Sequence, residues 1–351
     1  MLRSAPCAPP CQAARHRQRR TVAPCAALPT VFIDGEAGTT GLQVRERLAA
    51  RTDLRVVSLP DSQRKDAAAR AELLNSADAA ILCLPDDAAV EAVASVRPDN
   101  ARTVIIDAST AHRVAPGWAY GFPELTREHS AVVAASRRIA NPGCYPTGFV
   151  ALTRPLVDAG LLAPGAALSC HAVSGYSGGG KALIKVFEDA AAGAGEAEPY
   201  GAYGFDLKHK HLPEMGRWSG LGRAPIFCPA VGAFAQGMLV SVPLHYDVLR
   251  TAGIPDVGAA LHEALLAHYP GAAFVSVQPL NAGGPTVLQR GTFLRPDALN
   301  GTNRLELFVY ASAAAGAAVL VARLDNLGKG ASGAAVQNLN LALGLDPSAG
   351  L

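Results

Sequence analysis

From residue 30 onward, short apolar runs alternate with longer amphipathic stretches, and this pattern constrains the fold more than any other feature. The runs lie at 31–33, 56–59, 79–84, 103–107 and 131–136. Each has the length of a strand buried on both faces, and the stretches between them have room for a helix. Such alternation predicts an α/β domain with a parallel, doubly wound sheet.

The pattern changes after residue 141, where glycine-rich turns separate a mixed set of strands, among them 167–174, 238–246 and 304–312. These strands predict a second, α+β domain with a mainly antiparallel sheet. The last stretch, 330–345, has loose helical spacing, and we expect it to pack back on the first domain. We therefore assign 29–143 plus 325–351 to a cofactor-binding domain and 144–324 to a catalytic and oligomerisation domain.

Half of the 351 residues are apolar and 17% are charged, enough for two packed cores. The formal charge of +2 is unevenly placed, because residues 1–30 contain five arginines and no acid. The remainder is slightly acidic, which argues against nucleic acid or an anionic membrane surface as partner and leaves a small molecule. The longest uncharged stretch, 307–322, is shorter than the ~20 residues of a membrane-spanning helix, and we expect it to be buried.

Residues 1–28 combine Arg, Ala, Ser and Pro without an apolar core. This composition is typical of a transit peptide, which predicts delivery to the plastid stroma or, alternatively, the mitochondrial matrix. A disordered tail without function is the competing interpretation. Three of the seven cysteines lie in this segment, and the other four form no CxxC pair, so neither a disulfide framework nor a metal site is predicted.

A glycine-rich loop joins the first predicted strand to the first predicted helix. Gly35, Gly38 and Gly41 flank Thr39 and Thr40 in GEAGTTG. Glycines there let the backbone approach a pyrophosphate, whose charge is held by amides at the helix N-terminus, as in Rossmann-type domains. The GxxGxxG spacing is weak by itself, and a turn without a ligand is the alternative.

The segment after the second predicted strand bears on the choice of nicotinamide cofactor. Asp61 is placed to bond a ribose hydroxyl, whereas Ser62, Arg64 and Lys65 supply donors and positive charge for a 2'-phosphate. We therefore predict NADP as the cofactor in preference to NAD. The alternative is that these residues form a solvated helix start.

Cys144 follows a Pro-Gly turn and precedes an apolar, helix-like stretch in NPGCYPTGF. A cysteine at a helix N-terminus is exposed to amides and a dipole that favour the thiolate, the form that attacks carbon. A small buried side chain is the competing interpretation for a lone cysteine. The neighbouring residues favour a nucleophile.

With this motif, the sequence resembles a known family, N-acetyl-gamma-glutamyl-phosphate reductase of arginine biosynthesis, in its shorter, second form. The signature NPGCYPTG carries the resemblance, and further similar segments span nearly the whole chain after the N-terminal extension. They are IDGEAGTTG at 33–41, DASTAHR at 107–113, YGFPEL at 120–125, SGYSGGGK at 174–181, KHKHLPEM at 208–215, QGM at 236–238 and LDNLGKGASGAAVQNLN at 324–340.

The resemblance implies a semialdehyde-dehydrogenase-like fold and a thioester mechanism. Cys144 attacks an acyl phosphate and expels phosphate, NADPH reduces the thioester, and N-acetylglutamate 5-semialdehyde is released. A general base must take the proton from sulfur and later protonate the oxyanion. The resemblance assigns this role to His211, with His209 in reserve, and Glu214 is expected to orient the imidazole or contact the substrate.

The substrate carries a phosphate and a carboxylate, which require cations or amides. Arg113 is the first candidate, and an ion pair within the fold is its alternative role. Lys181, with Ser174 and Gly175, forms a second candidate anion site. The resemblance further places three residues near the nicotinamide ring: Asn326, Gly328 and Lys329. It also implies a homo-oligomer, a dimer or tetramer formed through the second domain.

Two other functions remain open from the sequence. The first is a reductase for a related acyl phosphate, aspartyl or acetylaminoadipyl phosphate, because one methylene changes specificity by only ~1–3 kcal/mol. The second is a catalytically silent NADP-binding regulator on the same fold. Preference for the acetylated aldehyde over aspartate semialdehyde tests the first alternative, and NADP binding without turnover of either aldehyde would indicate the second.

Overall fold

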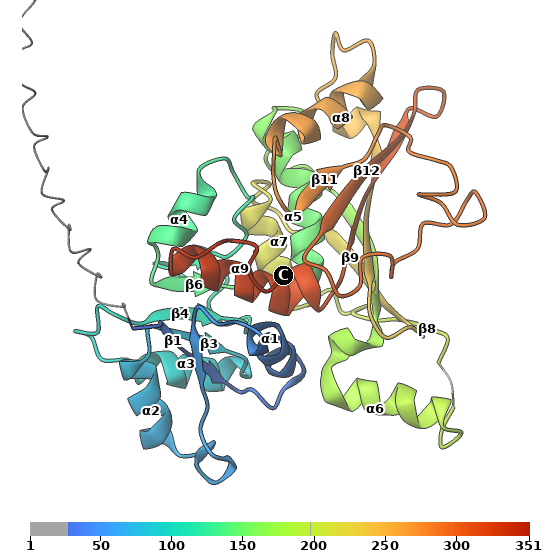
Figure 1. Ribbon diagram of the computed structural model, residues 1–351. Helices are drawn as coiled ribbons and strands as arrows, with labels where there is room; N and C mark the ends of the chain where they lie inside the picture. Colours follow the sequence, from blue (N-terminus) through green and yellow to red (C-terminus); the bar gives the residue numbers. More distant parts are fainter. Residues whose placement is uncertain (1–26, 197) are drawn as a thin grey trace, which may run out of the picture.

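The computed structural model describes residues 27–196 and 198–351, so residues 1–26 of the predicted transit peptide lie outside the described residues. Two sheets with their covering helices make up the described chain (Figure 1). The elements of the first part are β1 (Thr30–Asp34), α1 (Thr39–Ala49), β2 (Arg55–Val57), η1 (Asp61–Gln63), α2 (Ala67–Ser76), β3 (Ala79–Leu82), α3 (Asp86–Ala94), β4 (Val104–Asp107), β5 (Ala119–Tyr120), α4 (His129–Ala135) and β6 (Arg138–Ala140).

The second part contains the larger sheet, and the chain then returns to the first. Its elements are α5 (Cys144–Asp158), β7 (Ser169–Gly175), η2 (Tyr176–Gly179), α6 (Gly180–Ala191), β8 (Tyr200–Ala202), α7 (Leu212–Trp218), β9 (Ile226–Gly232), β10 (Met238–His245), η3 (Tyr246–Val248), α8 (Val257–His268), β11 (Val275–Val277), β12 (Leu305–Ser312), β13 (Ala317–Leu324), the π-helical turn η4 (Gly328–Ser332) and α9 (Gly333–Ala342).

The first sheet is parallel throughout, in the order β2-β1-β3-β4-β6-β5. β1, β3 and β4 are buried on both faces, as the apolar runs predicted, whereas the edge strand β2 is only half-buried. Val31 and Ile33 of β1 pack toward α1, α4 and α9, whereas Phe32 packs toward α2 and α3. The doubly wound Rossmann-type architecture predicted from the alternation is confirmed.

One predicted strand is wrong. The run at 131–136 lies in helix α4, and the strand at this position in the sheet is β6. Val133 of α4 is buried and Val132 is 47% exposed, so the run presents one face to the core, as a helix does. Alanine, which makes up half of the run, favours helix over strand.

The second sheet has seven strands in the order β11-β12-β13-β10-β7-β9-β8. Pairings β11–β12 and β7–β9 are parallel and the other four are antiparallel, so the prediction of a mainly antiparallel sheet is confirmed. Helices α5, α7 and α8 cover one face, which contains the largest hydrophobic core. The opposite face carries only a small cluster around Phe308 and Val321.

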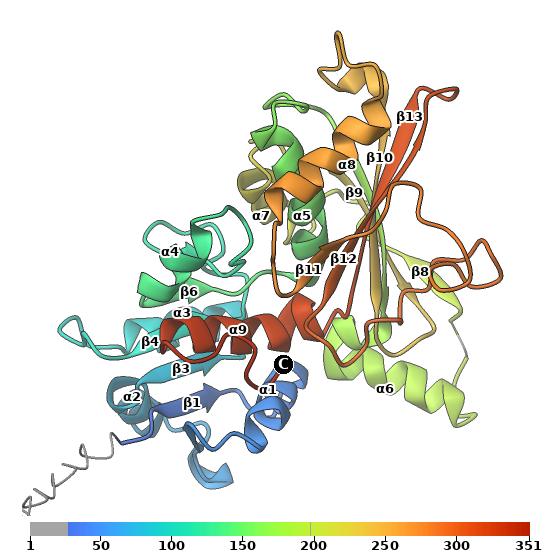
Figure 2. The same ribbon diagram turned by 45° about the horizontal axis from the view of Figure 1, so that its top comes forward.

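The C-terminal helix α9 lies against the first sheet, beside α1 and α4 (Figure 2). Val336 and Leu339 share a core with side chains of β1, β3 and β4. The guanidinium of Arg51, at the end of α1, donates to the Asn340 side chain and to the carbonyl of Ala349, both at 2.9 Å. These contacts fix the returning segment, and with it the η4 turn that precedes α9.

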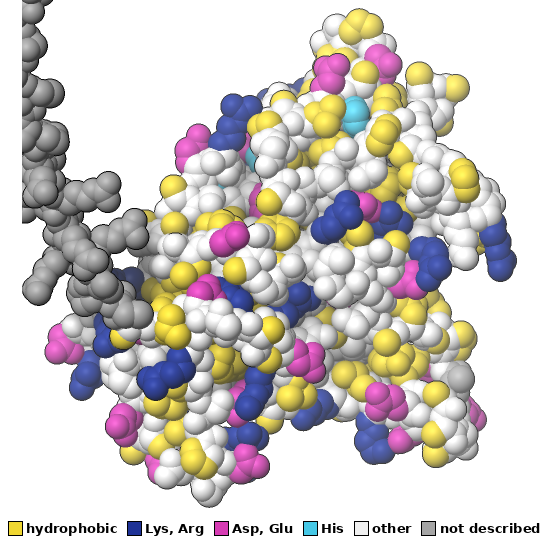
Figure 3. All heavy atoms as spheres, viewed as in Figure 1, with side chains coloured by type: hydrophobic (Ala, Val, Ile, Leu, Met, Phe, Trp, Pro, Cys, Tyr) yellow, Lys and Arg dark blue, Asp and Glu magenta, His cyan; other side chains and the backbone are white. Residues whose placement is uncertain are grey.

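Lys and Arg are interspersed with Asp and Glu over the face seen in Figure 3. Residues 307–322, the uncharged stretch, belong to the antiparallel pair β12–β13, whose strands are largely buried. In the part of the chain that the structure describes, no helix combines the length and apolar character needed to cross a membrane. Across the same residues, His, Cys, Asp and Glu form no group of three suited to holding a metal ion.

Candidate active site

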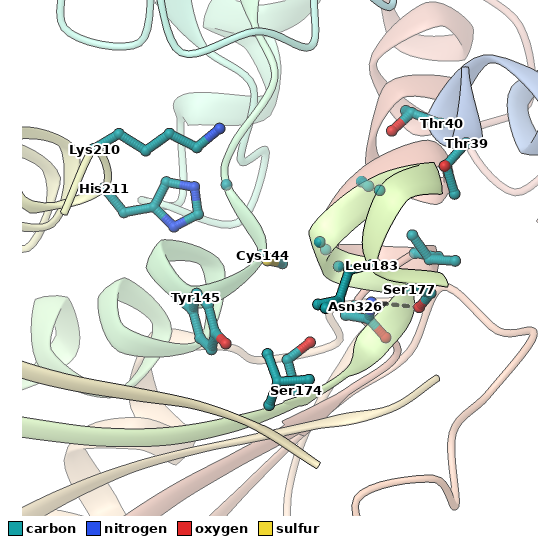
Figure 4. Close-up of a pocket in the computed structure, with 18 of the residues that line it drawn as sticks. Thr39, Thr40, Cys144, Tyr145, Ser174, Ser177, Leu183, Lys210, His211 and Asn326 are labelled. Carbon is teal, nitrogen blue, oxygen red and sulfur yellow. Dashed lines mark hydrogen bonds between the residues drawn. The ribbon is translucent and has the colours of Figure 1, made fainter. Parts of the chain in front are cut away.

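A cavity of about 710 Å³ opens between the two domains, at the carboxyl ends of the first sheet's strands (Figure 4). Both domains contribute to its wall, which is where ligands bind in open α/β sheets. It brings together eight of the residues predicted from the sequence: Cys144, His211, Arg113, Ser174, His209, Asn326, Thr39 and Thr40.

Cys144 is the first residue of α5, and Gly143 before it caps the helix without a side-chain hydrogen bond. The half-buried thiol therefore lies at a helix N-terminus, as predicted. Burial nevertheless raises the pKa of Cys144 to about 11, although the charge of Arg113 and hydrogen bonds from backbone amides lower it. The backbone amides at the start of α5 thus favour the thiolate, but desolvation of the charged form outweighs them in the free enzyme.

His211 faces the same cavity and is 6% exposed. Burial lowers its pKa well below 6.5, and the charges of Arg113, His209 and Lys210 lower it further. Its Nδ1 is buried without a hydrogen-bond partner among the described residues. Both causes favour the neutral imidazole, the form that can act as a base.

Because Gly143 has no side chain, the His211 imidazole can approach the turn before Cys144. A methyl group at Gly143 would lie 2.7 Å from Nε2 of His211 and 2.6 Å from Nη1 of Arg113. Any larger residue before Cys144 would therefore collide with both side chains. This glycine is required by close approach at the site, since its φ of −73° is open to any residue.

Glu214 stabilises this arrangement through three hydrogen bonds. Its carboxylate, buried and outside the cavity lining, accepts hydrogen bonds from Arg113 Nη1 at 3.1 Å, the Tyr120 hydroxyl at 2.8 Å and the Gly143 amide at 2.8 Å. Glu214 was expected to orient the imidazole or contact the substrate. Instead, its carboxylate accepts hydrogen bonds from Arg113 and from the turn before Cys144. Arg113 remains in the cavity wall with its charge paired.

His209 and Lys210 complete this side of the cavity. The His209 ring accepts the backbone amide of His211 at 3.1 Å, so it supports the loop that carries the base. Lys210 was not predicted, although it stands between the two predicted histidines. Its side chain runs alongside the His211 ring in Figure 4. A cation between two candidate bases was the signal that could have identified it.

The glycine-rich segment 174–181, which begins at the end of β7, contributes only in part to the cavity with Cys144. Ser174 lines it, and Asn326 donates from Nδ2 to the neighbouring Ser177 hydroxyl at 3.0 Å. Gly175 lies outside the lining, because its backbone packs against Ala235, where a methyl group would lie 2.5 Å from the carbonyl oxygen. Lys181, predicted for the substrate, instead lines a smaller second cavity beside the loop of α1.

The first glycine-rich loop has the features that a dinucleotide requires. Gly35 has φ +84°, and a methyl group there would lie 2.3 Å from the carbonyl oxygen of Cys83. Gly38 caps α1 without a side-chain bond, which leaves the amides at the start of this helix available for an anion. Thr39 and Thr40 line both cavities, so the loop extends from the second cavity to the cavity with Cys144.

The residues predicted to select the 2'-phosphate lie outside both cavities. Ser62 and Lys65 are exposed. The Arg64 guanidinium forms ion pairs with Glu36 at 3.1 Å and with Asp61 at 2.8 Å. The sequence did not point to Glu36, because it lies 28 positions away from Arg64 in the chain.

Two of the three residues expected near the nicotinamide ring are placed elsewhere. The Lys329 ammonium is buried, 2.9 Å from both carboxylate oxygens of Glu124 and 2.6 Å from Gln337. Gly328 packs against the carbonyl of Thr302. Gly328 and Lys329 stabilise the η4 turn. Of the three residues, only Asn326 lines the cavity with Cys144.

Comparison with known proteins adds to this geometry. Residues 30–133 match the family described as "Semialdehyde dehydrogenase, NAD binding domain", and residues 144–326 match "Semialdehyde dehydrogenase, dimerisation domain". The chain is 52% identical over 326 residues to "N-acetyl-gamma-glutamyl-phosphate reductase 2" of Nostoc sp., covering 92% of this chain and 99% of that protein. It is 53% identical to the N-acetyl-gamma-glutamyl-phosphate reductase of Burkholderia ambifaria, covering 91% and 97%.

Solved structures with the same fold share little sequence with this chain. Aspartate semialdehyde dehydrogenase II of Vibrio cholerae superposes with a TM-score of 0.64 at 16% identity, covering 90% of this chain and 98% of that one. Aspartate semialdehyde dehydrogenase of Candida albicans, solved with NADP, superposes with a TM-score of 0.56 at 13% identity and the same coverage. These likenesses confirm the predicted semialdehyde-dehydrogenase-like fold.

Proposed function

Because this chain belongs to the N-acetyl-gamma-glutamyl-phosphate reductase family, we propose that it reduces N-acetyl-gamma-glutamyl phosphate to N-acetylglutamate 5-semialdehyde with NADPH, a step of arginine biosynthesis. One observation carries the proposal. A cysteine at a helix N-terminus, a buried neutral histidine and a paired arginine face one cavity between a dinucleotide-binding domain and a second domain. This is the constellation that acyl transfer to sulfur requires.

The neutral pair of Cys144 and His211 suggests how the thiolate forms. With the thiol pKa raised and the imidazole pKa lowered, both groups favour their neutral forms in the free enzyme. His211 accepts the thiol proton as sulfur attacks the carbonyl carbon, the carbon–oxygen bond to phosphate breaks, and the proton leaves with phosphate. Arg113 and Lys210 stabilise the anionic groups of the substrate during this step.

NADPH, when bound, supplies the hydride that reduces the Cys144 thioester. The chain contributes the Gly35, Gly38 and Gly41 loop for the pyrophosphate and Asn326 in the cavity wall. Collapse of the thiohemiacetal oxyanion then breaks the carbon–sulfur bond and releases the aldehyde, and a proton from solvent, delivered through His211, restores the Cys144 thiol. The preference for NADP over NAD is supported by cations beside the end of β2, Arg64 among them.

The test measures NADP reduction by the full chain with N-acetylglutamate 5-semialdehyde and inorganic phosphate, the reverse direction. We expect turnover that requires phosphate and prefers the acetylated aldehyde to aspartate semialdehyde. Cys144→Ser should abolish turnover, whereas Cys228→Ser, a half-buried cysteine outside the cavity lining, should retain it. His211→Gln should lower kcat by about 10²- to 10⁴-fold.

Three results would redirect the proposal. Activity that survives in Cys144→Ser would exclude the thioester mechanism. A preference for aspartate semialdehyde or for the acetylaminoadipate aldehyde would reassign the substrate to a related acyl phosphate. Normal NADP binding without turnover of any of these aldehydes would favour a catalytically silent regulator.

A further inference from the structure

A buried carboxylate that accepts hydrogen bonds from three side chains lies within the first glycine-rich loop. Glu36 directly follows Gly35, and its side chain is 7% exposed. Its carboxylate accepts hydrogen bonds from Arg45 Nη1 at 2.8 Å, from the Ser58 hydroxyl at 2.8 Å and from Arg64 Nη2 at 3.1 Å. None of these residues takes part in the chemistry at Cys144.

The three donors come from separate elements and converge from different directions. Arg45 belongs to α1, Ser58 directly follows β2, and Arg64 directly follows η1. The side chains of Arg45 and Arg64 are 53% and 38% exposed. The donors therefore lie at the rim of the domain, where a ligand arriving from solvent meets them directly, while the carboxylate that they hold is buried.

This cluster lies where the adenosine ribose of a dinucleotide is held in Rossmann-type domains. β1 and β2 pair in parallel, so their carboxyl ends, followed by Glu36 and Ser58, meet at one edge of the sheet. The residue after the second strand is the one that contacts the ribose 2'-position. Two guanidinium groups and a hydroxyl form a donor set suited to a phosphate, which offers more charge and more acceptor oxygens than one carboxylate.

We propose that Arg45, Ser58 and Arg64 bind the 2'-phosphate of NADP(H), and that the Glu36 carboxylate occupies the place of this phosphate until the cofactor displaces it. The inference rests on the use of NADP(H) proposed above. A carboxylate and a phosphate held by the same donors would repel each other. The phosphate therefore binds as the Glu36 side chain turns away. Glu36 thus weakens the binding of NADP(H) and promotes its release.

A second role of Glu36 would have the opposite consequence. A carboxylate beside the end of the second strand can accept the ribose 2'-hydroxyl, which selects NAD. In that case removal of the Glu36 charge would weaken binding of a nucleotide that lacks the phosphate. The two roles therefore differ in the sign of a single measured change.

The test compares two nucleotides that differ only in the 2'-phosphate, 2',5'-ADP and 5'-AMP, by isothermal titration calorimetry on the full chain. We expect Glu36→Gln to bind 2',5'-ADP about tenfold more tightly and 5'-AMP unchanged. Arg45→Met and Arg64→Met should each weaken 2',5'-ADP by about tenfold or more. Arg55→Met removes the same charge at the opposite end of β2 and should change neither affinity.

Unchanged or weaker binding of 2',5'-ADP by Glu36→Gln would overturn the proposal, as would equal affinities for the two nucleotides in the unaltered protein. Should Glu36→Gln fail to fold, the two arginine variants decide, because loss of 2',5'-ADP binding in both is required. The calorimetry needs no aldehyde and no turnover. A failed catalytic assay with this binding pattern intact would therefore refute the proposed reaction and leave the phosphate site standing.

Discussion

At the scale of single residues, burial favours the neutral forms of the nucleophile and the base in the free enzyme. Burial raises the pKa of the Cys144 thiol and lowers that of the His211 imidazole, because each charged form loses hydration. Arg113 acts on both, favouring the thiolate and disfavouring the imidazolium. A buried arginine paired with Glu214 therefore tunes the nucleophile and the base together.

The first prediction concerns the reactivity of Cys144 in the free enzyme. Because the thiolate is the reactive form, alkylation of Cys144 by iodoacetamide should be slow near pH 7 and rise up to the highest pH tested, about 10. Arg113→Met should slow alkylation further at each pH, since this charge lowers the pKa of the thiol. Mass spectrometry of the Cys144 peptide measures both rates.

The exposed Arg223 provides the control for this experiment. Arg223→Met removes one positive charge from the same domain outside the catalytic cavity and should leave the alkylation rate unchanged. Rapid alkylation of Cys144 at pH 7 in the unaltered enzyme would contradict the prediction, since it would mean that the thiolate already exists there.

At the scale of elements, the π-helical turn η4 supports the start of α5. Turns of this kind are frequent at functional sites. Two of its side chains are held by hydrogen bonds: Lys329 by Glu124 and Gln337, and Ser332 by Arg47 and the carbonyl of Leu327. This bracing explains why Lys329, expected at the cofactor, faces inward.

The close packing of η4 on α5 leads to the second prediction. A methyl group at Gly330 would lie 2.8 Å from Cβ of Cys144, so Gly330→Ala must displace one of the two backbones. We expect Gly330→Ala to lower the free energy of unfolding by about 1–3 kcal/mol. A shift of the nucleophile by about 1 Å should lower kcat by about 10²-fold. Thermal denaturation and steady-state kinetics measure these effects.

Gly283→Ala is the matched control, because the nearest neighbour of a methyl group there is 3.8 Å away. It should change neither stability nor turnover appreciably. If Gly330→Ala kept full kcat, the position of Cys144 would not depend on η4.

At the scale of the whole molecule, the second sheet is covered on one face and largely open on the other. On the open face, Val319 is 40% exposed and Pro243 beside it is exposed as well. The small cluster around Phe308 and Val321 covers only part of this face. Apolar side chains left open on a sheet are typical of a surface that pairs with another copy of the chain.

We therefore expect the purified chain to be a dimer or tetramer that pairs through this face. Val319→Lys, which places a charge in such an interface, should shift the mass measured by light scattering toward the monomer. Val248→Lys, at a site 37% exposed in η3, should not. A monomeric unaltered protein, or an assembly unaffected by Val319→Lys, would contradict this assignment of the interface.

The sequence by itself determined the elements whose signals are local. Apolar runs specified most strands of both sheets, and the glycines before α1 and α5 marked the two helix starts that face the cavity. It failed at 131–136, where an alanine- and valine-containing run suits both a strand and a half-buried helix. Only its packing against the first sheet made it α4.

The tertiary structure decided what depends on distant partners. Glu214 meets Arg113 across 101 positions, Lys329 meets Glu124 across 205, and Glu36 meets Arg64 across 28. A motif shows that a charged side chain is present but not which way it points, because burial of a charge is stabilised by whichever opposite charge the fold brings near. Desolvation, which decides the pKa of Cys144, likewise exists only once the surrounding chain is in place.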